Sequence, residues 1–199
     1  MRVLSALQAD VGQREALGRI RYWGERFGLA NITGGWVGRN ELQLNFTDPE
    51  TGTPLPIAAA GGGSQHVLPF LLNCFSSPAP RILIADELEQ GLHPKWQLTL
   101  AELLAEAVAR KNQVILCTQS PTLVLGLCSM VAQQKLAPES VVVYSMKRGE
   151  TGAAEAAANR ISSSGAISGG WFEHFAEVEG ALLRAFLPPT DTDDDAATA

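Results

Sequence analysis

The chain has 199 residues, of which 46% are hydrophobic and 18% charged, and its formal net charge at pH 7 is −6. This length supports one substantial core, so we expect a single domain over residues 1–187 and a disordered acidic tail over 188–199. The net acidity argues against broad nucleic-acid binding by the chain alone. Its apolar runs are too short for a signal peptide or a membrane span, and we expect a cytoplasmic protein without a membrane partner.

The first part of the domain, residues 1–57, is expected to hold one helix and antiparallel strands. Residues 13–27 carry apolar side chains at helical spacing, with arginines on the remaining faces. The segments predicted after this helix are strands at 32–37 and 42–46, a turn with the sequence DPETGT at 48–53, and a brief strand that ends at Ile57.

Residues 58–147 are expected to form the centre of the domain, where helices alternate with buried strands. Such alternation predicts the α/β class, with a mainly parallel sheet flanked by helices. Proline is favourable at the first position of a helix, so Pro94 and Pro121 mark two helix starts. The predicted helices span 64–74, 94–110 and 121–134, and the predicted strands span 82–85, 114–117 and 141–146.

Residues 148–187 are expected to form a C-terminal loop and helix. The stretch from Gly149 to Gly170 is rich in glycine, alanine and serine, and it predicts a mobile loop with one short strand at 159–161. Residues 171–186 predict an amphipathic helix that completes the domain.

Two adjacent carboxylates, Asp86 and Glu87, follow the apolar run at 82–85 directly. Side chains just past the carboxyl end of a parallel strand lie where α/β sheets bind ligands. A second apolar run, at 114–117, ends in polar residues that include Gln119. Two polar strand ends of this kind predict a ligand site, although a buried strand followed by solvated acids explains the first run equally well.

A cluster of glycines precedes the acidic strand and opens directly into an apolar helix. Consecutive glycines let a backbone approach an anion closely, and the free N–H groups at a helix start favour a phosphate. Two plainer interpretations stay open: a flexible turn before a core helix, and Ser64 acting as the N-cap.

The order of these three segments resembles the C-terminal half of an ABC-type P-loop ATPase, in particular the SMC-like and OLD-like branch. The resemblance covers residues 57–125 most strongly, and it implies that ATP and Mg²⁺ are the cofactors. It implies that Asp86 is the Walker B aspartate that holds Mg²⁺ and that Glu87 orients or deprotonates the attacking water. Gln119 stands where the family usually has a histidine that contacts the γ-phosphate. The implied signature loop consists of Gly61, Gly62, Gly63, Ser64 and Gln65, and the residues that match the pattern after Walker B are Glu89, Leu92, His93 and Pro94.

The 199 residues contain no G-x-x-x-x-G-K-[ST] motif, and none of the four lysines follows a glycine loop. That Walker A loop normally cradles the phosphates and supplies a lysine and an Mg²⁺-binding hydroxyl. We therefore expect the chain to act as an ATPase only when a Walker A-bearing partner, or a missing N-terminal segment, completes it within a homo- or heterodimer. DNA or a nuclease is the further partner that the resemblance suggests.

A second function from another class also stays open: a catalytically degenerate lobe that only dimerises or docks partners. The missing Walker A loop and the glutamine at position 119 favour this alternative. The intact pair of Asp86 and Glu87 favours catalysis, because a lobe freed from catalysis needs no two acids at a strand end.

A metal-hydrolase site is a further alternative, because His93 lies close in sequence to the three acids Asp86, Glu87 and Glu89. Its spacing lacks the two histidines, four residues apart, that place two ligands on one helix face. The sequence also contains no G-x-S-x-G motif, which would indicate a serine nucleophile. The three cysteines, Cys74, Cys117 and Cys128, have no metal-ligand spacing, and two of them lie in apolar runs. All three are expected to be free thiols.

Overall fold

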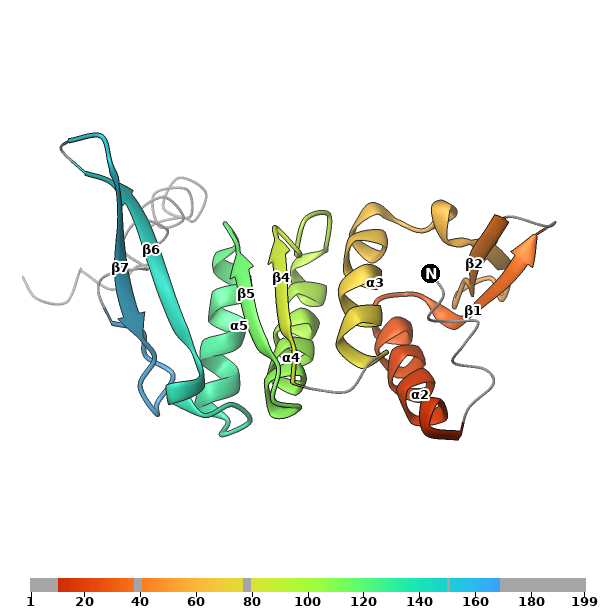
Figure 1. Cartoon of the computed structure of the whole chain (residues 1–199), viewed down its shortest axis with the longest axis horizontal. Coiled ribbons are helices and arrows are strands. Elements are labelled where there is room, and N and C mark those ends of the chain that lie inside the picture. The colour runs from red at the N-terminus through yellow and green to blue at the C-terminus, as the bar shows by residue number, and fades with distance from the viewer. Residues whose placement is uncertain (1–10, 38–40, 77–79, 150, 169–199) are drawn as a thin grey trace, which may run out of the picture.

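The computed structural model describes residues 11–37, 41–76, 80–149 and 151–168. Their elements follow one another along the long axis of the molecule, from β1–β3 at one end to the β6–β7 pair at the other (Figure 1). The helix predicted at 171–186 and the acidic tail at 188–199 lie outside the described residues.

The N-terminal part consists of one helix and a three-stranded antiparallel sheet, as the sequence predicts. Helix α2 spans Val11–Arg26, and Ile20 and Trp23 on it are buried in the main core. The strands pair in the order β1–β2–β3, and an Asp48 turn joins the last two through hydrogen bonds from the backbone N–H groups of Glu50 and Thr51. The strands are β1 (Ala30–Val37), β2 (Glu41–Thr47) and β3 (Pro54–Pro56).

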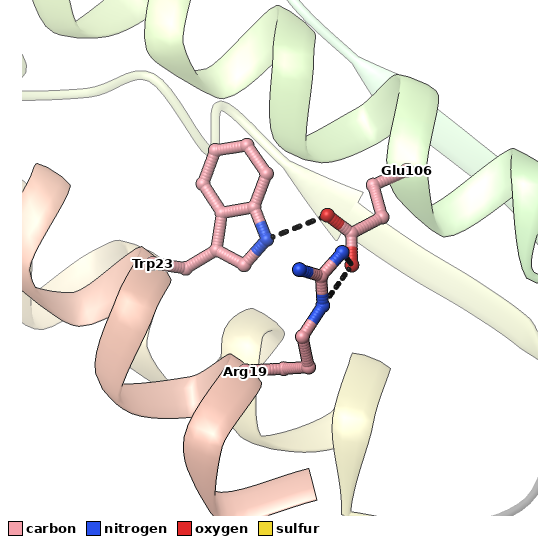
Figure 2. A network of polar contacts seen from close by, with 3 residues as sticks. All are labelled: Arg19, Trp23 and Glu106. Carbon is pink, nitrogen blue, oxygen red and sulfur yellow. Dashed lines mark hydrogen bonds and ion pairs between the residues drawn. The ribbon is translucent and has the colours of Figure 1, made fainter. Parts of the chain in front are cut away.

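Polar contacts fasten α2 to the helix α4, which spans Pro94–Ala109. Figure 2 shows Trp23 donating its indole N–H to one Glu106 oxygen at 3.0 Å, while the Nε of Arg19 donates to the other at 2.8 Å. Arg26 forms a second ion pair with Glu102 of α4, at 2.5 Å. These two arginines of α2 therefore bind the neighbouring helix while their side chains stay partly exposed.

The centre of the molecule is a parallel pair of strands, β4 (Ile82–Asp86) and β5 (Gln113–Cys117), with helices packed on one side. Leu83 is buried in the main core beneath β4, and Val114 and Leu116 pack on that core from β5. Helix α4 and helix α5 (Pro121–Ala132) contribute to the same core, as does α3 (Gly62–Phe75), which lies beside β4 on the side away from β5 (Figure 1). The predicted α/β class is confirmed, and among the described strands the parallel pairing is confined to β4 and β5.

Strand β7 departs from the sequence expectation. The stretch predicted as a loop with a short strand at 159–161 contains a seven-residue strand, Ala154–Arg160, that pairs antiparallel with β6 (Val142–Arg148). Alanine and glutamate have low strand propensity, so pairing with β6 decides the outcome here. Buried Asn159 supports the pair, because its amide donates to the carbonyl of Val143 at 3.1 Å and to the hydroxyl of Ser145 at 2.8 Å.

Two of the three cysteines are buried free thiols, as expected. Burial raises the pKa of the Cys74 thiol to about 11 and also raises the pKa of Cys128, so both stay protonated at neutral pH and unreactive. Cys117, at the end of β5, is exposed. None of the helices that the structure describes has the length and apolar character needed to cross a membrane.

Candidate site at the carboxyl ends of the central strands

The carboxyl ends of β4 and β5 bring the predicted acidic pair and Gln119 together. Asp86 ends β4, lies exposed, and pairs in register with Cys117, the last residue of β5. The backbone N–H of Glu87 donates to the carbonyl of Cys117 at 2.9 Å. Glu87 has a φ of 45°, in the left-handed region that residues other than glycine seldom adopt. Such backbone strain concentrates at functional sites, and here it makes the end of β4 a candidate site.

Gln119 contacts Glu87 across the two strand ends. Its side-chain Nε2 donates to Oε1 of Glu87 at 2.6 Å, although the two residues are far apart in sequence. Glu87 and Gln119 are the two residues that the sequence predicts to be catalytic. The hydrogen bond between them fixes the orientation of the Glu87 carboxylate. The amide group carries two N–H donors, so one remains for a ligand beside the carboxylate.

A second polar contact lies next to the first and joins the same two loops. The hydroxyl of Thr118 donates to Glu89, a carboxylate that is only 7% exposed and whose second oxygen, Oε2, has no hydrogen-bond partner within the described residues. The hydroxyl of Ser120 donates to Gln97 of α4 at 2.5 Å, and Gln97 in turn donates to the carbonyl of Leu92 at 3.2 Å. These bonds stiffen the loops that hold Glu87 and Gln119.

The sequence missed Gln97 as a supporting residue. It lies within α4 and belongs to no motif, so only the packing of α4 against both loops reveals its role. The only available signal is its position five residues after Leu92, at the start of a helix that follows the acidic segment.

The glycine loop begins α3 two residues earlier than predicted. Gly61 is the N-cap and offers no side-chain cap, so Ser64 does not cap the helix. Gly61 and Gly62 are exposed, and a Cβ atom at either position would meet no atom within 4 Å. Gln65 stabilises this arrangement by donating to the carbonyl of Ala60 at 2.7 Å. The first N–H groups of α3 therefore lie at a surface that leaves room for an anion.

Gly63 and Ser64 are engaged in packing. A Cβ on Gly63 would lie 2.6 Å from the carbonyl oxygen of Gly91, so the helix start and the loop after β4 touch through two glycines. The hydroxyl of buried Ser64 donates to the carbonyl of Phe27 at 2.8 Å. Within the predicted signature loop, open space is thus found around Gly61 and Gly62.

Gly63→Ala is expected to lower the free energy of unfolding by about 1–3 kcal/mol, because the added methyl group overlaps the backbone at Gly91. Gly62→Ala is the matched control and should leave stability unchanged or slightly raised, since the same methyl group meets open space there. Urea unfolding of both variants and the parent measures the difference. Equal stability of the two variants would mean that the two glycines do not pack as described.

The structure gives His93 a capping role. Its Nδ1 accepts the backbone N–H of Lys95 at 3.2 Å and so caps α4. Within the described part of the chain, no three histidine, cysteine, aspartate or glutamate side chains gather closely enough to hold a metal ion by themselves. Mg²⁺ in a phosphoryl-transfer site needs only one or two carboxylates, with phosphate and water supplying the rest. The single exposed carboxylate of Asp86 fits that requirement.

A groove of about 600 Å³ runs between α3 and β4 beside this site. The lining comes from α3 on one side and from β4 on the other, and Asp86 belongs to it. The lining includes two basic or imidazole side chains, His66 and Arg81, beside the apolar Ile82 and Ile84.

Comparison with solved structures defines the fold as that of SMC ATPase head domains. One similar structure comes from work on the structural biochemistry of ATP-driven dimerization and DNA-stimulated activation of SMC ATPases. It is 15% identical, with a TM-score of 0.53, over 85% of this chain and 96% of that one. Another is the Smc head domain with an extended coiled coil bound to the C-terminal domain of ScpA from Pyrococcus furiosus. It is 13% identical, with a TM-score of 0.53, over 86% of this chain and 38% of that one.

A third similar structure is the SmcHead bound to the C-winged helix domain of ScpA. It is 13% identical, with a TM-score of 0.53, and the alignment covers 77% of this chain and 45% of that one. The present chain thus spans less than half the length of the last two structures. At these identities the likeness establishes the fold alone.

The family follows from the sequence match. Residues 8–125 match the family described as "AAA domain, putative AbiEii toxin, Type IV TA system". Because this match covers more than half of the chain, the protein belongs to that family of AAA domains. A comparison with curated proteins gives no match.

Proposed function

We propose that the chain is one lobe of an ATP-hydrolysing site, completed by a Walker A loop from outside these 199 residues. The observation that carries this proposal is the hydrogen bond between Gln119 and a strained Glu87 at the carboxyl ends of two parallel strands. Glu87 is half-buried and keeps a disfavoured backbone conformation while it accepts this hydrogen bond, which is the kind of strain that concentrates at functional sites. Membership of an AAA-domain family and the SMC-head fold support an ATPase-type module.

Each side chain has a distinct task in this proposal. Asp86 would hold Mg²⁺ beside the phosphates, and the ion would neutralise charge that develops during phosphoryl transfer. Glu87 orients the attacking water and accepts its proton as the water oxygen bonds to the γ-phosphorus and ADP leaves. Gln119 holds Glu87 with one N–H and is placed to donate the other to a γ-phosphate oxygen.

The glycine loop has its task in a dimer. Gly61 and Gly62 present an open helix start to a nucleotide held by the opposite subunit. The similar SMC ATPase structure comes from work on ATP-driven dimerization, which supports a dimer as the working state. DNA or a nuclease remains the proposed downstream partner, and a cytoplasmic location agrees with these tasks.

A catalytically degenerate dimerisation module is the second candidate. One specific observation favours it: the amide of Gln119 already occupies one oxygen of the carboxylate that must face water. ATP turnover distinguishes the two candidates, because a degenerate lobe would bind nucleotide and dimerise without hydrolysing ATP.

Asp86→Asn should weaken binding of Mg²⁺–ATP to the completed assembly by at least ~10-fold, or about 1.4 kcal/mol, because the amide lacks the charge that Mg²⁺ requires. The completed assembly contains this chain and a Walker A-bearing segment, which is sought first in the coding sequence immediately upstream. Isothermal titration with and without Mg²⁺ measures the effect. Asp48→Asn, in the exposed turn, is the matched control and should bind normally. Undiminished binding by Asp86→Asn would overturn the assignment.

A further inference from the structure

Gln119 is held in place by the residues on either side of it. Before it, the hydroxyl of Thr118 donates to the Glu89 carboxylate in the loop after β4, and the same hydroxyl oxygen accepts the backbone N–H of Ser120 at 3.0 Å. After it, the hydroxyl of Ser120 donates to Gln97 of α4 at 2.5 Å and caps α5. The backbone of Gln119 is therefore anchored at both ends, although the residue itself is exposed.

Glu89 is the anchor that packing alone explains least. It is the one charged residue that is buried within the part of the chain that the structure describes. Its Oε1 accepts the hydroxyl of Thr118, whereas its Oε2 has no hydrogen-bond partner among the described residues. A buried carboxylate with an unmade hydrogen bond is costly, and each such group in a folded protein calls for an explanation. The cost indicates that Glu89 has a task beyond filling space.

The geometry does not suit Glu89 for a direct part in the chemistry. Its Oε2 is out of contact with solvent, so neither an attacking water nor Mg²⁺ reaches this oxygen in the structure. Asp86 is exposed and Glu87 is half-buried, so these two carboxylates are the accessible ones. The contact that Glu89 does make is with Thr118, the residue next to Gln119.

We propose that Glu89 is a positioning residue for Gln119. Through the hydroxyl of Thr118, it holds the loop after β5 where the Gln119 amide meets the carboxylate of Glu87. Glu87 and Glu89 share one tight turn, because the N–H of Gln90 donates to the carbonyl of Glu87 at 2.9 Å. This inference rests on the proposed function, in which the amide orients the catalytic carboxylate. The role requires a hydrogen-bond acceptor at position 89, and it does not require a negative charge.

The side chain of Gln119 reports its own position by NMR, in the ¹⁵N-labelled full chain without nucleotide. Its amide signal is identified by its loss in Gln119→Leu, and the contribution of the Glu87 contact is defined by the shift in Glu87→Ala. We expect Thr118→Val and Glu89→Met to move the signal in the same way as Glu87→Ala, because each removes one partner of the Thr118–Glu89 bond. Thr118→Ser and Glu89→Gln should leave the signal near its parent position, since the hydroxyl and the acceptor oxygen remain.

Two matched controls separate this effect from a general loss of stability. Thr51 accepts the N–H of Thr53 at 3.3 Å in the exposed turn between β2 and β3, the same local arrangement as that of Thr118, so Thr51→Val should leave the Gln119 signal unchanged. Glu139→Met, at an exposed glutamate, should leave it unchanged as well. If Glu89→Met does not fold, Thr118→Val carries the same prediction. An unmoved signal in Thr118→Val overturns the proposal. A signal lost equally in Glu89→Gln and Glu89→Met also overturns it, because the charge and not the acceptor would then matter.

The proposed function and this inference fail in different ways. In the completed assembly, Thr118→Val should lower ATP turnover by about 10-fold or more with little change in binding of Mg²⁺–ATP, and Thr118→Ser should restore turnover. NMR shifts as described, in an assembly that never hydrolyses ATP, leave the positioning role standing and refute the catalytic role. Turnover that depends on Glu87 but is unchanged in Thr118→Val refutes the positioning role and leaves the catalytic role standing.

Discussion

In the completed assembly, Glu87→Gln is expected to reduce ATP turnover by at least ~100-fold while binding of Mg²⁺–ATP persists. The reason is that an amide keeps the shape of the side chain but cannot accept the proton of the attacking water, a role that contributes about 10²–10⁴-fold. Gln119 can still bond to the new amide through its carbonyl oxygen, so the loops should keep their arrangement. Phosphate release and equilibrium nucleotide binding are measured on the same samples.

Glu139→Gln is the control for this change, because Glu139 is an exposed glutamate outside the candidate site. It should leave both turnover and binding unchanged. The decisive comparison is with Asp86→Asn, which should lose binding itself. If Glu87→Gln and Asp86→Asn lost nucleotide binding equally, the division of roles between the two carboxylates would be wrong.

Gly62→Asp is expected to abolish ATP-dependent dimerisation of the completed assembly. The substitution puts a side chain and a negative charge at the open helix start, where the phosphate of the opposite subunit must approach. The fold should survive, because a Cβ at Gly62 meets no atom within 4 Å. Light scattering with and without ATP measures the mass of the assembly.

Gly18→Asp provides the control for charge and size. Gly18 is also exposed, with no atom within 4 Å of an added Cβ, but it lies on α2. It should dimerise like the parent. If Gly62→Asp also dimerised with ATP as the parent does, Gly61 and Gly62 would form an ordinary turn and the signature-loop assignment would fall.

The central strands and helices were predictable because their signals are local. Apolar runs at 82–85 and 114–117 ended in polar residues, and Pro94 and Pro121 begin α4 and α5 as the sequence indicates. Strand β7 was not predictable, because its alanine-rich sequence has little strand propensity and owes its conformation to β6.

The candidate site was predictable only in part, for a physical reason. Motif order indicated that Glu87 and Gln119 belong to one site, but their contact depends on the register of two strands distant in sequence. The packing of Gly63 on Gly91 depends on tertiary structure in the same way. Among the described strands, β5 and β6 each pair along one edge only, and no sequence signal predicts this, since an exposed strand and a buried one can share the same apolar run.

ATP hydrolysis by the isolated chain, compared with hydrolysis after addition of the Walker A-bearing segment, tests most directly whether this lobe works only when completed. We predict negligible Mg²⁺-dependent turnover by the chain alone, because its 199 residues contain no G-x-x-x-x-G-K-[ST] motif, the loop whose lysine and N–H groups phosphoryl transfer normally relies on. Turnover should appear with the segment, saturate at equal amounts of the two, and vanish in Glu87→Gln. Robust turnover by the isolated chain that disappears in Glu87→Gln would contradict the need for a second segment.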